Sequence, residues 1–347
     1  MKIRHKKWES AELLIIKDPN THFEVHLTTF GASIVKVFLP DKSGNVGNVV
    51  FGHNFPTDYL EIGGYMGASV GRVANRIKEG QFSLDGQGYQ LARNDHRQHC
   101  LHGGMEGFSH KLWNLLEVHN QEDPNQVWVT MEYISGDGEE HFPGNLTTRV
   151  IFTVSPMKIR WEFFAFSDKP TIVNLTNHSY WNLDNPERPI DDHILTLSAN
   201  RYNEIDKLCL PTGILSSVDH TGVDFCAGKI LAETFTSFGD VDHNFFLTDF
   251  KQKSHPLDVI AIGTLSCPRT GRSMQIATSE PCVQVYTGNF MEQVSSYGKS
   301  CIKHNAICLE TQRMPDAIHY PEYQNQVILR PGLTYIHKTV HTFSIMP

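Results

Sequence analysis

One carboxylate is notable because of the strand that carries it. Residues 306–310 read Ala-Ile-Cys-Leu-Glu, and the alternation of Ile307 and Leu309 with small residues predicts a short buried β-strand. Glu310 then lies on the face opposite Ile307 and Leu309, beside small side chains that leave room for a ligand. Burial in such a space would raise the pKa of Glu310 and make it a stronger base. The alternative is an ordinary surface glutamate at a strand end.

A histidine within a run of amides and aromatics is the second candidate. Residues 171–183 read TIVNLTNHSYWNL, and alternation places Asn174 and His178 on one face, followed by Tyr180 and Trp181. Amide groups both donate and accept hydrogen bonds, so they suit sugar hydroxyls, and aromatic rings cover the apolar side of a pyranose. The segment therefore predicts a sugar site. A buried histidine with aromatics that simply pack is the alternative.

A glycine-rich stretch supplies possible hydrogen-bond donors. Residues 63–77 read GGYMGASVGRVANRI. The stretch lacks the strand-then-helix setting and the Lys-Ser/Thr ending of a phosphate loop, which argues against a nucleotide site. Asn75 and Arg76 instead resemble a donor pair directed into a pocket, with a salt-bridged surface arginine as the alternative.

Three histidines follow at intervals of three, at positions 96, 99 and 102. This spacing would gather His96, His99 and His102 around a zinc ion only on a helix, and the flanking residues do not predict one. His102 precedes a Gly-Gly pair that allows the backbone to approach a ligand closely. We therefore expect no metal, a functional role for His102, and solvent exposure for His96 and His99.

Two further polar side chains complete the candidate set. Asp242 stands in a polar turn just before an apolar run, and Gln284 shares a strand face with Tyr286. A carboxylate can accept one hydroxyl on each oxygen, so such groups bind vicinal diols.

Composition excludes several classes of function. The net charge is −8 and the pI about 6.2, with no basic run beyond Lys6–Lys7, which argues against nucleic acid and anionic membranes as partners. Seven scattered cysteines without a C-x-x-C pair predict free thiols in a reducing, cytoplasmic compartment. The apolar run at Leu13–Ile16 is too short for a signal-peptide core, and no stretch reaches the length of a membrane helix.

The elements that must position these residues are almost all strands. Period-two alternation predicts strands at 49–51, 127–134, 146–154 and 159–166, and a hairpin around Asp85-Gly86. Helical periodicity is nearly absent, although Thr57–Glu61 predicts a single turn. Without a linker or a repeat, the chain is expected to form one all-β domain over residues 1–347, a large antiparallel β-sandwich.

Seven motifs together resemble the aldose 1-epimerase (galactose mutarotase) family. They occur in the family's order between about residues 65 and 320, and they read GRVANRI, LHGG, GEEHFPG, NLTNHSYWNL, DHNF, QVYTGNF and CLETQRMPDA. Each is weak alone, and seven in order are specific. The resemblance implies a galactose mutarotase-like supersandwich with neither cofactor nor metal. Its small-molecule substrates would be free aldohexoses such as galactose and glucose, whose α and β anomers it would interconvert.

The resemblance also implies a role for each candidate residue. Glu310 would be the general base and His178 the general acid, and the sugar hydroxyls would be held by Asn75, Arg76, His102, Asp242 and Gln284. Such a pair would open the sugar ring, allow rotation about the bond to carbon 2, and close it from the other face. We expect nearby carboxylates such as Asp242 to favour the charged form of His178. Trp181, where the family commonly has Phe, and the HRQHC loop before LHGG leave the sugar preference open, as the sequence leaves the oligomeric state.

Three other functions stay open. An epimerase for phosphorylated hexoses would need additional cations, and only Arg72 and Arg76 lie near the motifs. A non-catalytic sugar-binding sandwich would not need both Glu310 and His178. A retaining glycosidase would need two carboxylates about 5–5.5 Å apart, and the adjacent pair Glu139-Glu140 would face opposite sides of a strand.

Overall fold

The chain is built mainly of antiparallel strands. The computed structural model describes residues 1–120, 123–248, 250, 255 and 258–347. Strands account for 47% of the structure and helices for 10%, which confirms the predicted all-β class. No helix in these described ranges has both the length and the apolar character needed to cross a bilayer.

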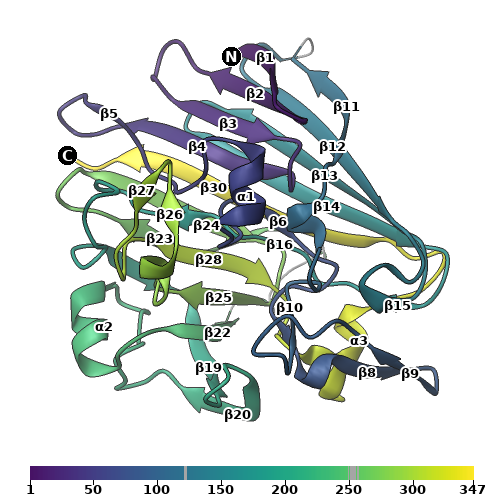
Figure 1. The fold of residues 1–347 in the computed structure, drawn as a ribbon. Coiled ribbons are helices and arrows are strands. Elements are labelled where there is room, and N and C mark those ends of the chain that lie inside the picture. The colour runs from purple at the N-terminus through teal and green to yellow at the C-terminus, as the bar shows by residue number, and fades with distance from the viewer. Residues whose placement is uncertain (121–122, 249, 251–254, 256–257) are drawn as a thin grey trace.

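Three large sheets make up most of the molecule (Figure 1). The five-stranded sheet has the order β1 (Lys2–Trp8), β2 (Ala11–Lys17), β3 (Glu24–Thr28), β4 (Ser33–Pro40), β5 (Val46–Asn48). The nine-stranded sheet has the order β11 (Asn114–His119), β12 (Val127–Ser135), β13 (Leu146–Ser155), β14 (Lys158–Ser167), β30 (Tyr335–Ile345), β24 (Arg272–Thr278), β23 (Ile260–Ser266), β18 (Ile194–Leu197), β21 (Lys229–Ile230). The six-stranded sheet has the order β17 (Tyr180–Trp181), β28 (Ile307–Gln312), β25 (Cys282–Tyr286), β22 (Asp242–Leu247), β19 (Ala199–Ile205), β20 (Pro211–Ser217).

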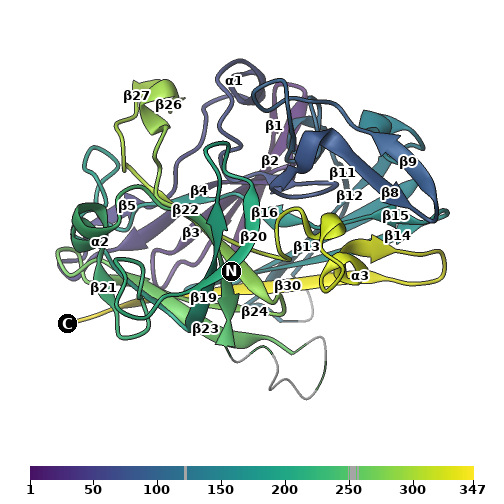
Figure 2. The same ribbon diagram turned by 90° about the horizontal axis from the view of Figure 1, so that it is seen from below.

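Short elements connect and cover these sheets. The two-stranded ladders are β6 (Ser69–Val70) with β16 (Thr176–Asn177), β7 (Arg76–Ile77) with β10 (Cys100–Leu101), β8 (Gln81–Leu84) with β9 (Gln87–Gln90), β15 (Thr171–Ile172) with β29 (Ile328–Leu329), and β26 (Ser295–Ser296) with β27 (Lys299–Ser300). The α-helices are α1 (Pro56–Glu61), α2 (Leu231–Ser237) and α3 (Gln324–Val327), and among the 3₁₀ turns is η3 (Glu139–His141). Figure 2 shows α1 on the opposite side of the sheets from β23 and β24.

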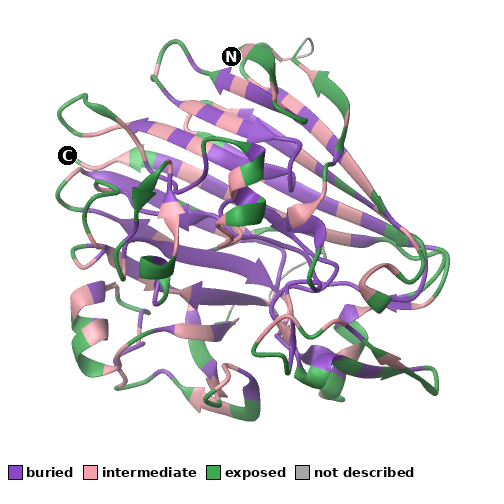
Figure 3. Cartoon of the chain, in the orientation of Figure 1, coloured by how far each residue is buried: buried purple, intermediate pink, exposed green. Residues whose placement is uncertain are grey.

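One hydrophobic core joins the three large sheets. It contains Leu27 of β3, Phe152 of β13 and Leu309 of β28, all nearly inaccessible to solvent. Figure 3 shows buried residues alternating with partly exposed ones along β2–β4 and β12–β14, whereas β28 and β25 are almost entirely buried. The alternation of buried and exposed residues is therefore clear in β2–β4 and β12–β14, whereas β25 and β28 are continuous buried runs.

Several predicted elements are confirmed at their expected places. The strands predicted at 127–134, 146–154 and 159–166 are β12, β13 and β14, each paired with the next. Asp85 and Gly86 both have positive φ, as a tight two-residue hairpin requires, and join β8 to β9. The turn predicted at Thr57–Glu61 is α1, which begins with a proline at its first position.

The strand predicted at 49–51 is wrong. The hairpin strand is β5, which ends at Asn48, because the amide of this residue takes over the hydrogen bonds of a ladder. Its Oδ1 accepts from the main-chain N–H of Val37, and its Nδ2 donates to the carbonyl of Val50. Val49 still donates its main-chain N–H to the carbonyl of Val37, and Val50, which is buried, forms an isolated bridge with Trp181.

Candidate active site

A cavity of about 420 Å³ opens above the six-stranded sheet, where β28 and β22 meet the loops that carry the glycine-rich and histidine-rich motifs. Its walls are formed by Gly64, Tyr65, Asn75, Arg76, Asp95, His96, Leu101, His102, His178, Tyr180, Asp242, Tyr286, Phe290, Met291, Gln293, Val294 and Glu310. The cavity combines apolar and aromatic surface with a few convergent polar groups, which is typical of a small-molecule site.

Glu310 lies on β28 with only 2% of its surface exposed. It faces the cavity, and its cross-strand neighbour on β25 is Gln284. Burial raises the pKa of this carboxyl well above its usual value, Asp242 raises it further, and Arg76 opposes the shift. The predicted direction of the pKa shift, upwards on burial, agrees with this environment.

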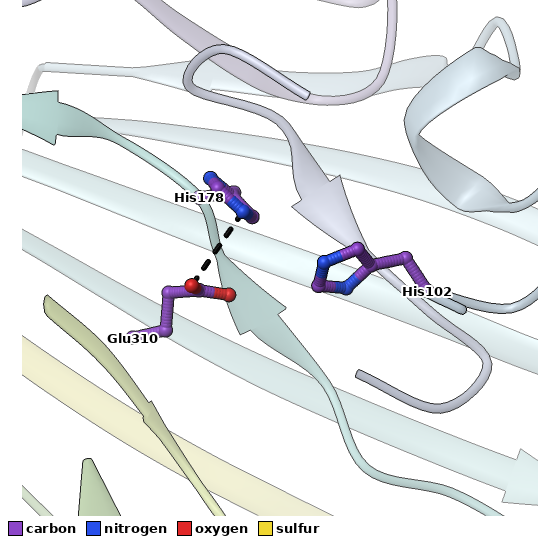
Figure 4. Close-up of side chains that lie close together, drawn as sticks. All are labelled: His102, His178 and Glu310. Atoms are coloured by element: carbon purple, nitrogen blue, oxygen red, sulfur yellow. Dashed lines mark ion pairs between the residues drawn. The ribbon is translucent and has the colours of Figure 1, made fainter. Parts of the chain in front are cut away.

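His178 projects towards Glu310 from the turn between β16 and β17 (Figure 4). Its Nε2 lies 3.5 Å from Oε1 of Glu310. The main chain is fixed on both sides, because its N–H donates to the carbonyl of Ala68 and its carbonyl accepts from the N–H of Gly67. The ring stacks on Tyr180, with centroids 5.0 Å apart. These contacts hold the imidazole in one orientation.

Burial lowers the pKa of His178 to about 4. The expectation that carboxylates such as Asp242 favour the imidazolium is therefore wrong. Loss of solvation dominates at this ring, and Asp242 acts instead on Glu310, whose pKa it raises. Burial thus shifts both groups towards their uncharged forms, the protonated carboxyl and the neutral imidazole.

His102 presents a hydrogen-bond donor to the same cavity. Its Nδ1 accepts a hydrogen bond of 3.1 Å from the main-chain N–H of Asn75, and the main-chain N–H of His102 donates to the Asn75 carbonyl. Both residues have positive φ, which turns the two loops towards each other. Because Nδ1 is occupied as an acceptor, the proton of the neutral ring resides on Nε2. Burial lowers the pKa of His102 well below its usual value, so the ring is a neutral donor.

The two histidines and the glutamate also meet the distance requirement of a metal site. One ligand atom from each of His102, His178 and Glu310 lies within 4.8 Å of the others. A metal-bound imidazole needs a lone pair on the nitrogen that faces the metal. The hydrogen bond from Asn75 places a proton on Nε2 of His102, which therefore has no lone pair to offer. The tautomer suits a hydroxyl ligand better than a cation.

A chain of polar contacts fixes the opposite wall. Nε of Arg76 donates to Oδ2 of Asp95 at 2.8 Å, and a guanidinium nitrogen lies 4.0 Å from Oδ2 of Asp242. Nε2 of Gln284 donates to Oδ1 of Asp242 at 2.7 Å. Burial alone would lower the pKa of Arg76, but the two carboxylates outweigh it and raise the pKa. Arg76 thus stays charged between two acids.

Comparison with known proteins gives the family. The family model described as Aldose 1-epimerase matches residues 12–342. The chain belongs to the aldose 1-epimerase family. It is 36% identical to the galactose mutarotase of Bos taurus over 326 residues, 92% of this chain and 91% of the relative. It is 32% identical to the aldose 1-epimerase of Escherichia coli over 333 residues, 93% of each chain.

Solved structures agree with this membership of the aldose 1-epimerase family. An aldose epimerase homologue from C. elegans superposes with a TM-score of 0.84 at 29% identity, covering 96% of this chain and 99% of that one. A galactose 1-epimerase from Lactobacillus acidophilus superposes with a TM-score of 0.85 at 23% identity, covering 100% and 99%. The predicted resemblance and the predicted galactose mutarotase-like fold are both confirmed.

Six of the seven predicted site residues line one cavity: Asn75, Arg76, His102, His178, Asp242 and Glu310. The seventh, Gln284, is buried and holds the carboxylate of Asp242, and its Oε1 has no hydrogen-bond partner among the described residues. Sequence reasoning missed Asp95 and Tyr65. Tyr65 lies in the glycine-rich stretch already singled out, and its ring lies 4.7 Å from that of His102 and 5.8 Å from that of His178.

One prediction about the neighbouring histidines is wrong. His99 was expected in solvent, but it is 1% exposed, and its Nδ1 accepts from the N–H of Glu79. His96 does match the expectation, with 64% of its side chain exposed at the cavity rim. Glu139 and Glu140 lie in the 3₁₀ turn η3, not on a strand, and Glu140 accepts from two main-chain N–H groups. Neither glutamate lines the cavity.

A second cavity, of about 450 Å³, lies elsewhere and contains none of the predicted site residues. Its buried carboxylate, Glu280, lies 3.4 Å from Nε of Arg313, whose guanidinium also covers the ring of Tyr335. In the second cavity Glu280 and Arg313 neutralise each other, whereas Glu310 and His178 face the first cavity.

Proposed function

We propose that the protein is an aldose 1-epimerase that interconverts the α and β anomers of free hexoses such as galactose and glucose. The observation that carries this proposal is the buried pair of Glu310 and His178, 3.5 Å apart at the wall of a hexose-sized cavity. Anomer interconversion needs one base and one acid acting on the same substrate, and Glu310 and His178 can supply them from fixed positions.

The pair works by sharing one proton. Ring opening begins with Glu310 as a carboxylate and His178 as an imidazolium, a state reached when the shared proton moves from Oε1 to Nε2. Glu310 takes the proton of the anomeric hydroxyl, and His178 gives its proton to the ring oxygen. The bond between carbon 1 and the ring oxygen breaks, and the pair is left uncharged. Burial disfavours the charged pair and favours the uncharged one, so the free energy needed to move the shared proton to Nε2 is regained when the ring opens.

The open-chain aldehyde then rotates and closes. A half turn about the bond between carbons 1 and 2 presents the other face of the carbonyl. The ring hydroxyl attacks carbon 1 and returns its proton to His178, while Glu310 protonates the new anomeric oxygen. The pair regains its starting state, so no cofactor and no net proton are consumed.

The remaining polar groups would hold the hydroxyls that do not react. Arg76, Asn75 and Nε2–H of His102 can donate, and Asp242 can accept from two hydroxyls of a diol. Gln284 would act partly through Asp242, whose carboxylate it orients. Tyr180 and Tyr286 offer ring surface to the apolar side of the sugar.

Charge favours a free sugar over its phosphate. Among the described residues that line the cavity, Arg76 is the one permanent cation, and it is already paired with Asp95 and lies near Asp242. A phosphate group would meet more carboxylates than cations. We therefore expect activity on glucose and little on glucose 6-phosphate, which the same assay can compare.

The test is polarimetry of freshly dissolved α-D-galactose and α-D-glucose, measured against spontaneous mutarotation. Wild-type protein should speed the approach to equilibrium, and Glu310→Gln and His178→Asn should both fall towards the uncatalysed rate. If only one variant fell, the roles of the pair would have to be reassigned. Folded wild-type protein without any acceleration on either sugar would refute the proposal and favour a binding module.

We also propose a reducing, cytoplasmic location. All seven cysteines are free thiols in the structure, which is the state that a reducing compartment maintains. Fractionation of cells with an antibody against the protein would test this proposal.

A further inference from the structure

A buried cysteine contacts the ring nitrogen of His178 that does not face Glu310. Sγ of Cys308 lies 3.5 Å from Nδ1 of His178, while Nε2 of the same ring faces Glu310. Cys308 precedes Glu310 by two residues on β28, is fully buried, and pairs with Tyr180 of β17. The strand that carries the carboxylate thus also supplies the group behind the histidine.

This contact can hold its proton in two ways. If the thiol donates to Nδ1, the single proton of the neutral ring is on Nε2, which then cannot accept a proton. If Nδ1–H donates to sulfur, Nε2 keeps a lone pair facing the cavity. In the proposed reaction Nε2 gives and regains a proton while Nδ1 stays protonated throughout, so only the second arrangement supports the cycle.

Groups around the ring favour the second arrangement. Oε1 of Glu310 lies 3.5 Å from Nε2, and burial favours the protonated form of this carboxyl. A protonated carboxyl donates to Nε2 and leaves the ring proton on Nδ1, which can then donate to sulfur. His102 gives the contrast, because an N–H donor from Asn75 occupies its Nδ1 and places the proton on Nε2. The two neighbouring histidines are therefore set in opposite tautomers, because a donor faces a different ring nitrogen in each.

We propose that Cys308 is a positioning residue whose sulfur accepts the Nδ1–H of His178 and so keeps the Nε2 lone pair directed at the cavity. The inference rests on the proposed function, in which His178 exchanges a proton with the sugar. A neutral sulfur is a weak acceptor and, unlike a carboxylate, adds no charge that would hold His178 as an imidazolium. It fixes the tautomer and leaves the proton free to move.

Nitrogen-15 NMR of histidine-labelled protein reads the tautomer directly. In the wild type we expect His178 with a protonated Nδ1 and an unprotonated Nε2, and His102 with the reverse pattern. In Cys308→Ala, His178 should become a mixture of tautomers and kcat should fall about three- to tenfold, the worth of one neutral hydrogen bond. Cys308→Ser should restore both the tautomer and most of kcat, because a hydroxyl oxygen also accepts.

Cys282→Ala is the matched control. Cys282 is an equally buried cysteine on the adjacent strand β25, and it does not line the cavity. Its removal should leave both the His178 spectrum and kcat unchanged. The His102 signals and a thermal unfolding curve show whether each variant is folded. If Cys308→Ala does not fold, the tautomer in the wild-type spectrum and the behaviour of Cys308→Ser still test the inference.

Two results would overturn the inference. One is a wild-type His178 protonated on Nε2, and the other is a Cys308→Ala protein whose His178 tautomer is unchanged. Failure of the proposed function would look different: the wild type would not accelerate mutarotation at all, whatever its histidine spectrum.

Discussion

Two arginines four residues apart in the GRVANRI motif have opposite environments. Arg72 is 2% exposed, and its guanidinium donates to the hydroxyl of Ser135 and to main-chain carbonyls of residues 135, 136, 143 and 144. Arg76 forms one short ion pair with Asp95 and one longer contact with Asp242, at the wall of the cavity.

The difference separates a residue that holds loops together from one that meets a ligand. Arg72 uses its donors on main-chain carbonyls, so it stabilises the fold and has no donor left for a ligand. Burial lowers its pKa to about 10, so the side chain stays charged at neutral pH. Arg76 is held by the carboxylates of Asp95 and Asp242 and lines the cavity, so it keeps donor capacity towards a ligand. Both residues are arginines in the same motif, so only their hydrogen-bond and ion-pair partners distinguish the two roles.

Arg76→Met should have the largest effect. It removes charge-assisted hydrogen bonds to substrate, each worth about 1.5–3 kcal/mol, so kcat/KM for galactose should fall about 10²- to 10³-fold. The free energy of unfolding should change little. Polarimetry at several sugar concentrations gives kcat/KM, and urea titration gives stability. Near wild-type kcat/KM would remove Arg76 from the site.

Arg72→Met should give the opposite pattern. It leaves several buried carbonyls without donors, and the free energy of unfolding should drop by about 3–5 kcal/mol. The kcat of the molecules that remain folded should stay near that of the wild type, as measured at low temperature with the folded fraction known. A large kcat loss with unchanged stability would erase the distinction between the two arginines.

The pH profile sharpens the same comparison. Activity needs one proton on the pair, so it should fall at low pH as His178 becomes charged near its lowered pKa of about 4, and at high pH as Glu310 loses the shared proton. Arg76 lowers the pKa of Glu310, so Arg76→Met should move the alkaline limb to higher pH. Arg72→Met should not move it. The profiles are measured as kcat against pH.

Asp95→Asn should have the smallest effect. The amide keeps a hydrogen bond to Nε of Arg76 but loses the charge, so Arg76 becomes less firmly placed. KM should rise about two- to fivefold, the value of a modest electrostatic contact, with kcat little changed. Inhibition by glucose 6-phosphate should become stronger, since one repelling carboxylate is gone. An unchanged KM would assign Asp95 to the scaffold.

The alternation of residues along the sequence was sufficient to predict which face of β28 carries Glu310. Ile307 and Leu309 pack in the main core, whereas Cys308 belongs to a separate cluster on the other face, as alternation predicts. The hairpin at Asp85-Gly86 was readable because those residue types favour positive φ. Such features depend on near neighbours in the chain.

Features that depend on residues far apart in the chain could not be predicted from the sequence. The burial of His99 depends on a contact with Glu79, twenty residues away, and Arg72 is defined by carbonyls more than sixty residues away. The sign of the His178 pKa shift was missed for a similar reason. Its carboxylate neighbours were visible in the motifs, but the extent of burial is a property of the assembled cavity.

The position of Glu310 has a consequence for how the protein loses activity. β28 lies inside the six-stranded sheet, paired with β17 on one side and β25 on the other. Amide groups in such strands exchange with solvent water only through near-global opening. Heating should therefore leave the turnover of the remaining native molecules intact until the whole sheet melts, and catalysis itself becomes a gauge of how much of the protein is still native.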